Sequence, residues 1–257
     1  MVALFNGMGG GTAALVSVAE YLRLTRGVGP TAVGAGEAIS IVLGTAIGAI
    51  SFTGSLIAFG KLQELLSGKP LQFPFQRSLN GLILLTIVAL GAAIALGIAG
   101  VPALWLLFAA ALLLGALFVL PIGGGDMPVV ISILNSLTGL AAALTGFVLH
   151  NQMMVGAGVL VGASGTLLTL LMSTAMNRSV GNVLFGAFGA GAVDPATHEF
   201  VVPRTAKQTT AEDTAIALAY ARSVVVVPGY GLAVAEAQHT VRELATDLEK
   251  RGVDVKY

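Results

Sequence analysis

Long apolar stretches alternate with short polar or Pro- and Gly-containing segments along the first two thirds of the chain. Each stretch is about 20 residues long, which is the length that an α-helix needs to cross the hydrocarbon core of a bilayer. Six stretches qualify, at residues 2–22, 37–60, 79–99, 102–121, 128–149 and 153–176. The pattern predicts an α-helical polytopic membrane bundle of about six transmembrane helices.

The pattern changes after the sixth stretch. Residues 187–210 are rich in Gly, Ala, Pro and Thr, a composition typical of a linker. A helix is expected to begin at Thr210, because the acidic residues Glu212 and Asp213 then fall in its first turn. A water-soluble segment is therefore predicted for residues 211–257.

After this first helix the soluble segment has the order strand, helix, strand. The β-branched run at residues 223–227 indicates a buried parallel strand. A long helix is expected from Leu232 to about Arg251, and Gly252 ends it before a second strand at residues 253–257. The segment is thus predicted to be a truncated α/β, Rossmann-like βαβ unit.

The distribution of charge supports a membrane part at residues 1–186. Only 10% of the residues are charged, and ten of the 26 formal charges precede Gly186. A charge at the centre of a bilayer costs roughly 2.5–3.5 kcal/mol, so long segments without charge are typical of membrane spans. The net charge of zero gives no indication of nucleic-acid binding. The lack of cysteine excludes disulfides and thiolate metal ligands within this sequence.

Lysine and arginine are distributed unequally between the two faces of the predicted bundle. Cytoplasmic loops of membrane proteins carry an excess of these residues. The richer face has Lys61, Lys69, Arg77 and Arg178, and the other has Arg23 and Arg26. We therefore expect the richer face, and the soluble segment that follows it, to be cytoplasmic.

A faint internal repeat is visible in the membrane part. Residues 3–10 align with residues 132–139, and residues 53–56 align with residues 164–167. An even number of spans separates the two copies, so both would have the same orientation, and parallel repeats can build a transport path between two halves. A common Gly- and Ala-rich composition explains the similarity equally well.

Polar residues within or beside the spans are candidates for function, because such groups are costly in a membrane. The candidates are Asn6, Asp126, Asn135 and Asn177. Two structural explanations stay open. Asp126 precedes Met127–Pro128 and could serve only as a helix N-cap, and Asn135 could make only an interhelical hydrogen bond. His150 at a span end is expected to be interfacial, and no histidines or carboxylates have the spacing of metal ligands.

The turn at residues 229–234 has the form G-x-G-x-x-small and lies between a predicted strand and a predicted helix. Gly229 permits a tight turn, and Gly231 lets the backbone approach a pyrophosphate at the helix N-terminus. Val234 stands where glycine or alanine is usual, and a plain tight turn is an alternative. No Walker lysine is present, so redox chemistry coupled to ion movement is favoured over ATP-driven transport.

Seven motifs together resemble the beta subunit of proton-translocating nicotinamide nucleotide transhydrogenase. They are Asn6–Gly11, Phe52–Ser55, Lys61–Gln63, Ser67–Pro70, Gly124–Val130, Ala175–Ser179 and Pro228–Ala235. The resemblance covers nearly all of the 257 residues. It implies a proton-conducting membrane part, a C-terminal domain that binds NADP(H), and a separate alpha subunit that binds NAD(H). It further implies direct hydride transfer between the two nicotinamides, coupled to inward proton flow across the inner cell membrane by a homodimer of alpha–beta units.

The resemblance also assigns roles to individual residues. It implies an NADP-binding turn made by Gly229, Tyr230, Gly231, Ala233 and Val234. Asn177 matches an asparagine associated with the proton path. Some family members have a membrane histidine after the Lys-Pro loop, whereas residues 76–80 contain none. Family members have further spans before Asn6 and a complete nucleotide domain after Tyr257, so this chain alone is not expected to turn over.

Two functions from other classes remain as alternatives. A small-solute permease with a regulatory nucleotide-binding tail would take up its solute without partner subunits. A purely structural membrane anchor would keep the activity of its complex when Asp126 or Asn177 is replaced by alanine.

Overall fold

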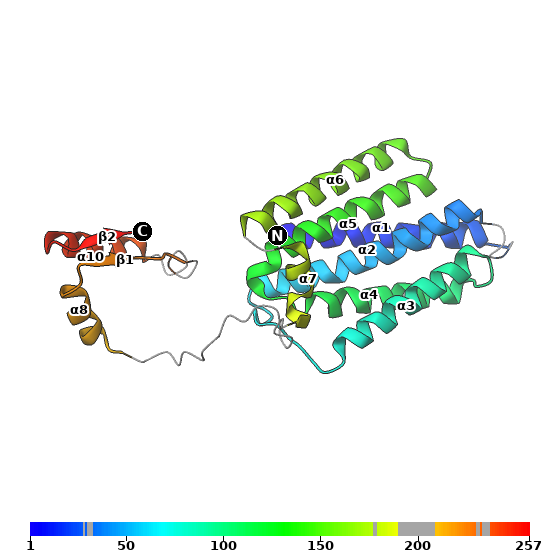
Figure 1. Ribbon diagram of the computed structural model, residues 1–257. Coiled ribbons are helices and arrows are strands. Elements are labelled where there is room, and N and C mark those ends of the chain that lie inside the picture. Colours follow the sequence, from blue (N-terminus) through cyan, green and yellow to red (C-terminus); the bar gives the residue numbers. More distant parts are fainter. Residues whose placement is uncertain (28, 30–32, 177–178, 190–208, 230–231, 233–236) are drawn as a thin grey trace. The chain divides into compact units, whose positions relative to one another are not determined.

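The structure is a computed structural model that describes residues 1–27, 29, 33–176, 179–189, 209–229, 232 and 237–257. The chain divides into two compact units, Met1–Asp194 and Pro195–Tyr257, and each is described by itself. The first unit is helical, and the second contains helices and a small sheet (Figure 1).

Six helices of the first unit are long and apolar enough to cross a membrane, which confirms the predicted spans. They are α1 (Val2–Thr25), α2 (Ala35–Leu62), α3 (Gln76–Ala95), α4 (Val101–Val119), α5 (Met127–Val148) and α6 (Gln152–Ala175). Most ends lie within two or three residues of the predicted positions. The helices run alongside one another in Figure 1, as expected for a membrane bundle.

The α2 helix is the centre of the bundle and contacts α1, α3, α4 and α5. In its most apolar 18-residue window 61% of the residues are buried, compared with 17% in α3 and in α6. The α1 and α5 helices are parallel, because Asn6 and Ala13 of α1 pair with Thr138 and Thr145 of α5 in the same order. This agrees with the common orientation expected for the two copies of the repeat.

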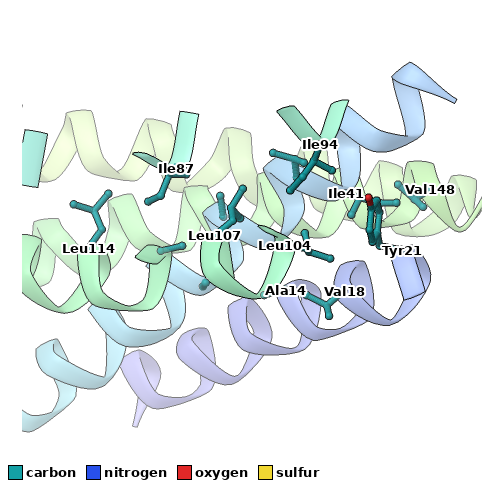
Figure 2. Packing of buried hydrophobic residues seen from close by; sticks show 14 residues of the cluster. Ala14, Val18, Tyr21, Ile41, Ile87, Ile94, Leu104, Leu107, Leu114 and Val148 are labelled. Carbon is teal, nitrogen blue, oxygen red and sulfur yellow. The ribbon is translucent and has the colours of Figure 1, made fainter. Parts of the chain in front are cut away.

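Two apolar clusters lie at opposite ends of the helices. One contains Tyr21, Ile41, Ile94, Leu104 and Leu107, and Figure 2 shows these side chains converging from α1, α2, α3 and α4. The other lies near the end of α4 and the start of α5. Its buried members include Val119, Ile122, Met127, Val130 and Val183. Between the clusters, α1, α2 and α5 meet through small and polar residues.

Val183 belongs to α7 (Val180–Gly189), a helix that the apolar pattern did not predict. This helix contacts α5 and α6. It has 10 residues, about half of the 20 that a transmembrane helix requires, so its apolar stretch is too short to indicate a span.

In the second unit, α8 (Ala211–Ala219) is capped by Thr210, whose hydroxyl accepts from the Asp213 N–H at 3.2 Å. Strands β1 (Ser223–Val225) and β2 (Asp254–Lys256) pair in parallel, with α10 (Gln238–Lys250) between them in the chain. This order of elements agrees with the predicted strand–helix–strand arrangement, and the Rossmann-like character of the segment stays a prediction.

The prediction that the first strand is buried is wrong for this structure. Val225 is 64% exposed, and Val227, just beyond the strand, is 86% exposed. A parallel strand becomes buried when helices cover both faces of its sheet. Here α10 packs against β2, and among the described residues no second layer covers the other face of the two-stranded sheet.

Candidate functional site

Polar side chains of α1, α2 and α5 face one another inside the bundle. The amide Nδ2 of Asn6 donates to the Ser55 Oγ at 2.9 Å. The hydroxyls of Ser51 and Thr138 lie 2.6 Å apart. Thr138 also contacts the main-chain oxygen of Asn6 at 3.5 Å, so the four residues form one hydrogen-bonded group. We call Asn6, Ser51, Ser55 and Thr138 the inner cluster.

A second polar contact lies farther along the same three helices. The hydroxyls of Ser17 and Thr145 are 3.1 Å apart and both are fully buried. Nearby in α2, the hydroxyl of Thr45 is buried and has no partner in the described part of the chain. Thr45 and Ser51 are separated by about 9 Å of helix rise. Water molecules between them would therefore be needed to join this contact to the inner cluster.

Glycines of α1 allow the inner cluster to form. A Cβ atom added to Gly7 would lie 3.1 Å from the Ser55 Cβ, and one added to Gly10 would lie 3.1 Å from the Ser51 Cβ. Residues without side chains let helix backbones approach closely in a membrane. The two serines of α2 can consequently reach α1 from within the helix interface.

The inner cluster, Thr45 and the Ser17–Thr145 contact together form a polar row along α1, α2 and α5. This row can form hydrogen bonds but contains no titratable group. Its members are an amide and hydroxyl groups, and a hydroxyl can donate and accept at the same time. Asn6 is 8% exposed, and its Oδ1 has no hydrogen-bond partner among the described residues. The row thus offers a buried acceptor to a water molecule or to a donor that arrives during function.

Asn135 is half-buried in α5, and no hydrogen bond of its side chain is found within the described residues. Thr138 marks the level of Asn6, and Asn135 lies about 4.5 Å from Thr138 along the helix axis. The two asparagines therefore occupy nearby levels on parallel helices. An interhelical hydrogen bond, the structural explanation considered for Asn135, is not found in this part of the chain.

Asp126 occupies the N-cap position of α5, as predicted, and Pro128 lies in the first turn. Its side chain makes no capping hydrogen bond. Asp126 ends a short 3₁₀ helix, η2 (Gly124–Asp126), whose Gly124 N–H donates to the Gly68 carbonyl at 2.8 Å. This bond joins the loop before α5 to the loop after α2. Asn177, the remaining candidate, lies outside the described residues.

Lys61, which marks the orientation and belongs to one of the family motifs, is a buried cation. It is 3% exposed, and its Nζ donates to the carbonyls of Leu120 and Ile122, the latter at 2.7 Å. These carbonyls follow the end of α4, where a positive charge is favourable. The position of Lys61 in the last turn of an apolar helix was the available signal.

At the opposite end of the bundle His150 is exposed, as expected for an interfacial residue. Its Nε2 lies 3.9 Å from a carboxylate oxygen of Glu37. Glu20 and Arg23 form an ion pair at the same end. Within the described residues, no group of three or more histidines, aspartates or glutamates could hold a metal ion.

Only part of the predicted nucleotide turn can be described. Gly229 follows β1, and the Leu232 N–H donates to its carbonyl at 3.0 Å. Among the described residues, a Cβ atom added to Gly229 would meet nothing within 4 Å. This open position beyond the carboxyl end of a parallel strand is compatible with a nucleotide. Tyr230, Gly231, Ala233 and Val234 lie outside the described residues.

The fold and these sites define a polytopic membrane protein that carries a polar row inside its helix bundle and a βαβ unit in its C-terminal part. Over residues 1–257 the chain matches the family model described as NAD(P) transhydrogenase beta subunit. Two relatives named NAD(P) transhydrogenase subunit beta, from Rhodospirillum rubrum and from a named strain of that species, are each 45% identical to the chain over 259 residues. The chain therefore belongs to the NAD(P) transhydrogenase beta subunit family. The alignment covers 100% of this chain and 56% of each relative, so the chain spans about half the length of these relatives.

Proposed function

We propose that this chain is the membrane part, with the beginning of the NADP-binding domain, of the beta subunit of a proton-translocating transhydrogenase. Hydride transfer between NADP(H) and NAD(H), the latter held by an alpha subunit, is coupled to proton movement across the inner cell membrane. The observation that carries the proposal is the hydrogen-bonded inner cluster of Asn6, Ser51, Ser55 and Thr138 in a member of this family.

In this proposal the row conducts protons through hydrogen bonds that reorganise. Each hydroxyl passes on a proton by donating one hydrogen bond while accepting another. Water occupies the gap between Ser51 and Thr45, where the unpaired Thr45 hydroxyl supplies one contact. Asn6 binds a further water through its free Oδ1, and Asn135 joins the path from the neighbouring helix. Asn177 remains a candidate of the same path on the basis of the family motif.

Asp126 is proposed to mark the cytoplasmic entrance of the path. It directly precedes α5, the helix that carries Asn135, Thr138 and Thr145. A shift of this helix start would therefore be transmitted to the hydrogen bonds of the row. The excess of lysine and arginine at this end of the bundle supports the cytoplasmic orientation.

NADP is proposed to bind at the turn that begins with Gly229. Gly229, Tyr230, Gly231, Ala233 and Val234 would approach the pyrophosphate with their backbone, and the helix N-terminus would stabilise its charge. The bound nicotinamide supplies the hydride chemistry. The remainder of the domain, the alpha subunit and a homodimer of alpha–beta units belong to the complete enzyme in this proposal.

The test uses the full-length subunit assembled with its alpha partner in vesicles. Hydride exchange between NADPH and an NAD analogue is measured with and without an imposed proton gradient. We expect Asn6→Ala and Ser55→Ala to reduce the gradient-dependent part of the rate by about tenfold, equivalent to about 1.4 kcal/mol. Thr86→Val is the matched control, because the hydroxyl of Thr86 is exposed and bonds only within its own helix.

Wild-type exchange that ignores the proton gradient would contradict the proposed coupling. Gradient-dependent exchange that survives in Asn6→Ala and Ser55→Ala would instead contradict the role of the row. Family membership gives no support to a permease, and loss of coupling in Asp126→Ala or Asn177→Ala would argue against a purely structural anchor.

A further inference from the structure

A cavity of about 370 Å³ lies between α2, α3, α4 and α5. Its size falls in the range of about 300–1,000 Å³ that is usual for small-molecule sites. The walls are apolar and are formed mainly by Ile50, Leu84, Leu114, Phe118 and Leu137. Two polar residues, Arg77 and Asn80, also line it. We propose that this cavity holds part of an acyl chain of one phospholipid, whose anionic headgroup lies outside the cavity beside Arg77.

The polar residues gather toward one end of the cavity. Arg77 lies in the first turn of α3, Asn80 lies about 4.5 Å farther along the axis, and Leu84 about 10 Å farther than Arg77. The order along α3 is thus a cation, an amide and then apolar side chains. A phospholipid has the matching order of phosphate, ester linkage and acyl chain.

Arg77 is available to an anion. In the described part of the chain it has no carboxylate within ion-pair distance and no side-chain hydrogen bond. Phe75, at the N-cap of α3, gives no capping bond, and the first turn contains no acidic residue. The positive end of the helix dipole therefore adds to the charge of Arg77. A guanidinium can bind a phosphate group through two parallel hydrogen bonds.

Asn80 is unusual for a residue in a membrane helix. Its Oδ1 is buried without a hydrogen-bond partner, and no bond of its amide nitrogen is found among the described residues. An unsatisfied amide is costly in an apolar environment. The ester oxygens and glycerol region of a lipid would supply polar partners at the level below the phosphate.

The walls of the cavity favour an acyl chain over a helix of another subunit. Helices pack closely in membranes where the facing surface consists of small residues. Such a surface exists elsewhere in this bundle, in the groove of α5 and α6 lined by Gly158, Gly162 and Ala163. The cavity beside α3 has branched and aromatic walls with a single glycine, Gly81, which a flexible chain can follow more easily than a helix can.

The test measures lipid bound to the full-length subunit in complex with its alpha partner. The complex is stripped of lipid in detergent, titrated with phosphatidylglycerol or with phosphatidylcholine of the same acyl chains, and examined by native mass spectrometry. We expect the wild type to bind phosphatidylglycerol about tenfold more tightly at this site, equivalent to about 1.4 kcal/mol. Arg77→Gln should abolish this preference, and Arg77→Lys should keep part of it.

A second variant fills the cavity without changing its charge. A Cβ atom added to Gly81 meets nothing within 4 Å, so Gly81→Leu should fold while it occupies the space of the acyl chain. It should reduce binding of both lipids. Gly156→Leu is the matched control, since Gly156 lies in another membrane helix and its Cβ would also meet nothing within 4 Å. Lys69→Gln is the charge control, because Lys69 lies at the same end of the bundle but does not line the cavity.

Equal binding of the two lipids by the wild type would overturn the headgroup assignment. Unchanged binding in both Arg77→Gln and Gly81→Leu would overturn the site. Cross-linking of a cysteine at position 81 to another subunit would identify a helix as the occupant and would also overturn the proposal. None of these readouts depends on hydride transfer, so failure here leaves the proposed enzymatic function independently testable.

Discussion

Two helix hairpins in the membrane unit, α1–α2 and α5–α6, are packed in the same way but carry different side chains. The residues of α1 that face α2 are at positions 7, 10, 14 and 17, and those of α5 that face α6 are at positions 136, 139, 143 and 146. The offset is 129 residues at every position. The faint repeat in the sequence therefore corresponds to a repeated packing face, which a shared composition alone would not produce.

The second helices of the hairpins correct the predicted alignment. Ser55 faces position 7 and Gly165 faces position 136, so Gly165 is the spatial counterpart of Ser55. The sequence alignment had paired Gly165 with Gly54, which instead faces Leu134 and Val119. One residue corresponds to a rotation of about 100° around a helix, so this shift exchanges one face for another.

The difference between the hairpins explains the difference between their asparagines. Asn6 bonds to Ser55, whereas Asn135 belongs to a hairpin in which Gly165 occupies the place of that serine. The same backbone arrangement thus holds a polar cluster in the first hairpin and a close backbone contact in the second. The second helices of the two hairpins also differ in burial, since α2 is mostly buried and α6 is mostly exposed.

The largest expected effect comes from filling the closest contact of either hairpin. A Cβ atom at Gly48 would lie 2.6 Å from the Gly10 carbonyl oxygen, and one at Gly158 would meet the backbone of Ala143 and Gly139. Overpacking costs about 1–3 kcal/mol and more when backbone must move, so we expect a loss of at least about 3 kcal/mol for Gly48→Val and Gly158→Val. Reversible unfolding in mixed micelles measures this, with Gly36→Val as an unobstructed control. A large loss in only one hairpin would break the equivalence.

A smaller loss of stability is expected from Gly165→Ser, which gives the second hairpin the serine that the first hairpin has at position 55. The Cβ of Gly165→Ser would lie 2.8 Å from the Ser136 N–H nitrogen, so the helices must separate slightly. We expect a loss of about 1–3 kcal/mol in the same unfolding measurement. A variant as stable as the wild type would mean that the second hairpin can accept a serine, and that glycine is not required there by packing.

The membrane spans were predictable from the sequence because hydrophobicity is a local property of about 20 consecutive residues. The pairing of Asn6 with Ser55 was not, since these residues are 49 positions apart and meet only at one rotation of both helices. The buried role of Lys61 also depends on carbonyls that are distant in sequence. Val225 shows that a local pattern can also mislead. Its β-branched run predicted a buried strand, but the described sheet leaves Val225 exposed.

A moderate effect is expected from Ser55→Ala, which removes the hydroxyl that pairs with Asn6 while adding no bulk. Interhelical hydrogen bonds in membranes contribute about 0.6 kcal/mol on average and up to about 1.7 kcal/mol. We expect a loss within this range, because the Asn6 Nδ2 then lacks its partner at a buried position. Ser164→Ala is the control, since this hydroxyl is exposed and bonds only within its own helix. A loss equal to that of the control would contradict the stabilising role of the Asn6–Ser55 bond.

The smallest effect distinguishes the two asparagines directly. Asn6→Ala removes a buried hydrogen bond and should cost about 0.6–1.7 kcal/mol, whereas Asn135→Ala removes none that is found in the described residues and should stay within about 0.5 kcal/mol of the wild type. The two unfolding free energies are compared in the same micelles. If Asn135→Ala lowers the unfolding free energy as much as Asn6→Ala does, then Asn135 has a hydrogen-bond partner outside its own hairpin. If Asn135→Ala is neutral in stability yet lowers gradient-dependent hydride exchange, the amide of Asn135 serves proton movement rather than stability. The two hairpins would then differ in function as they differ in side chains.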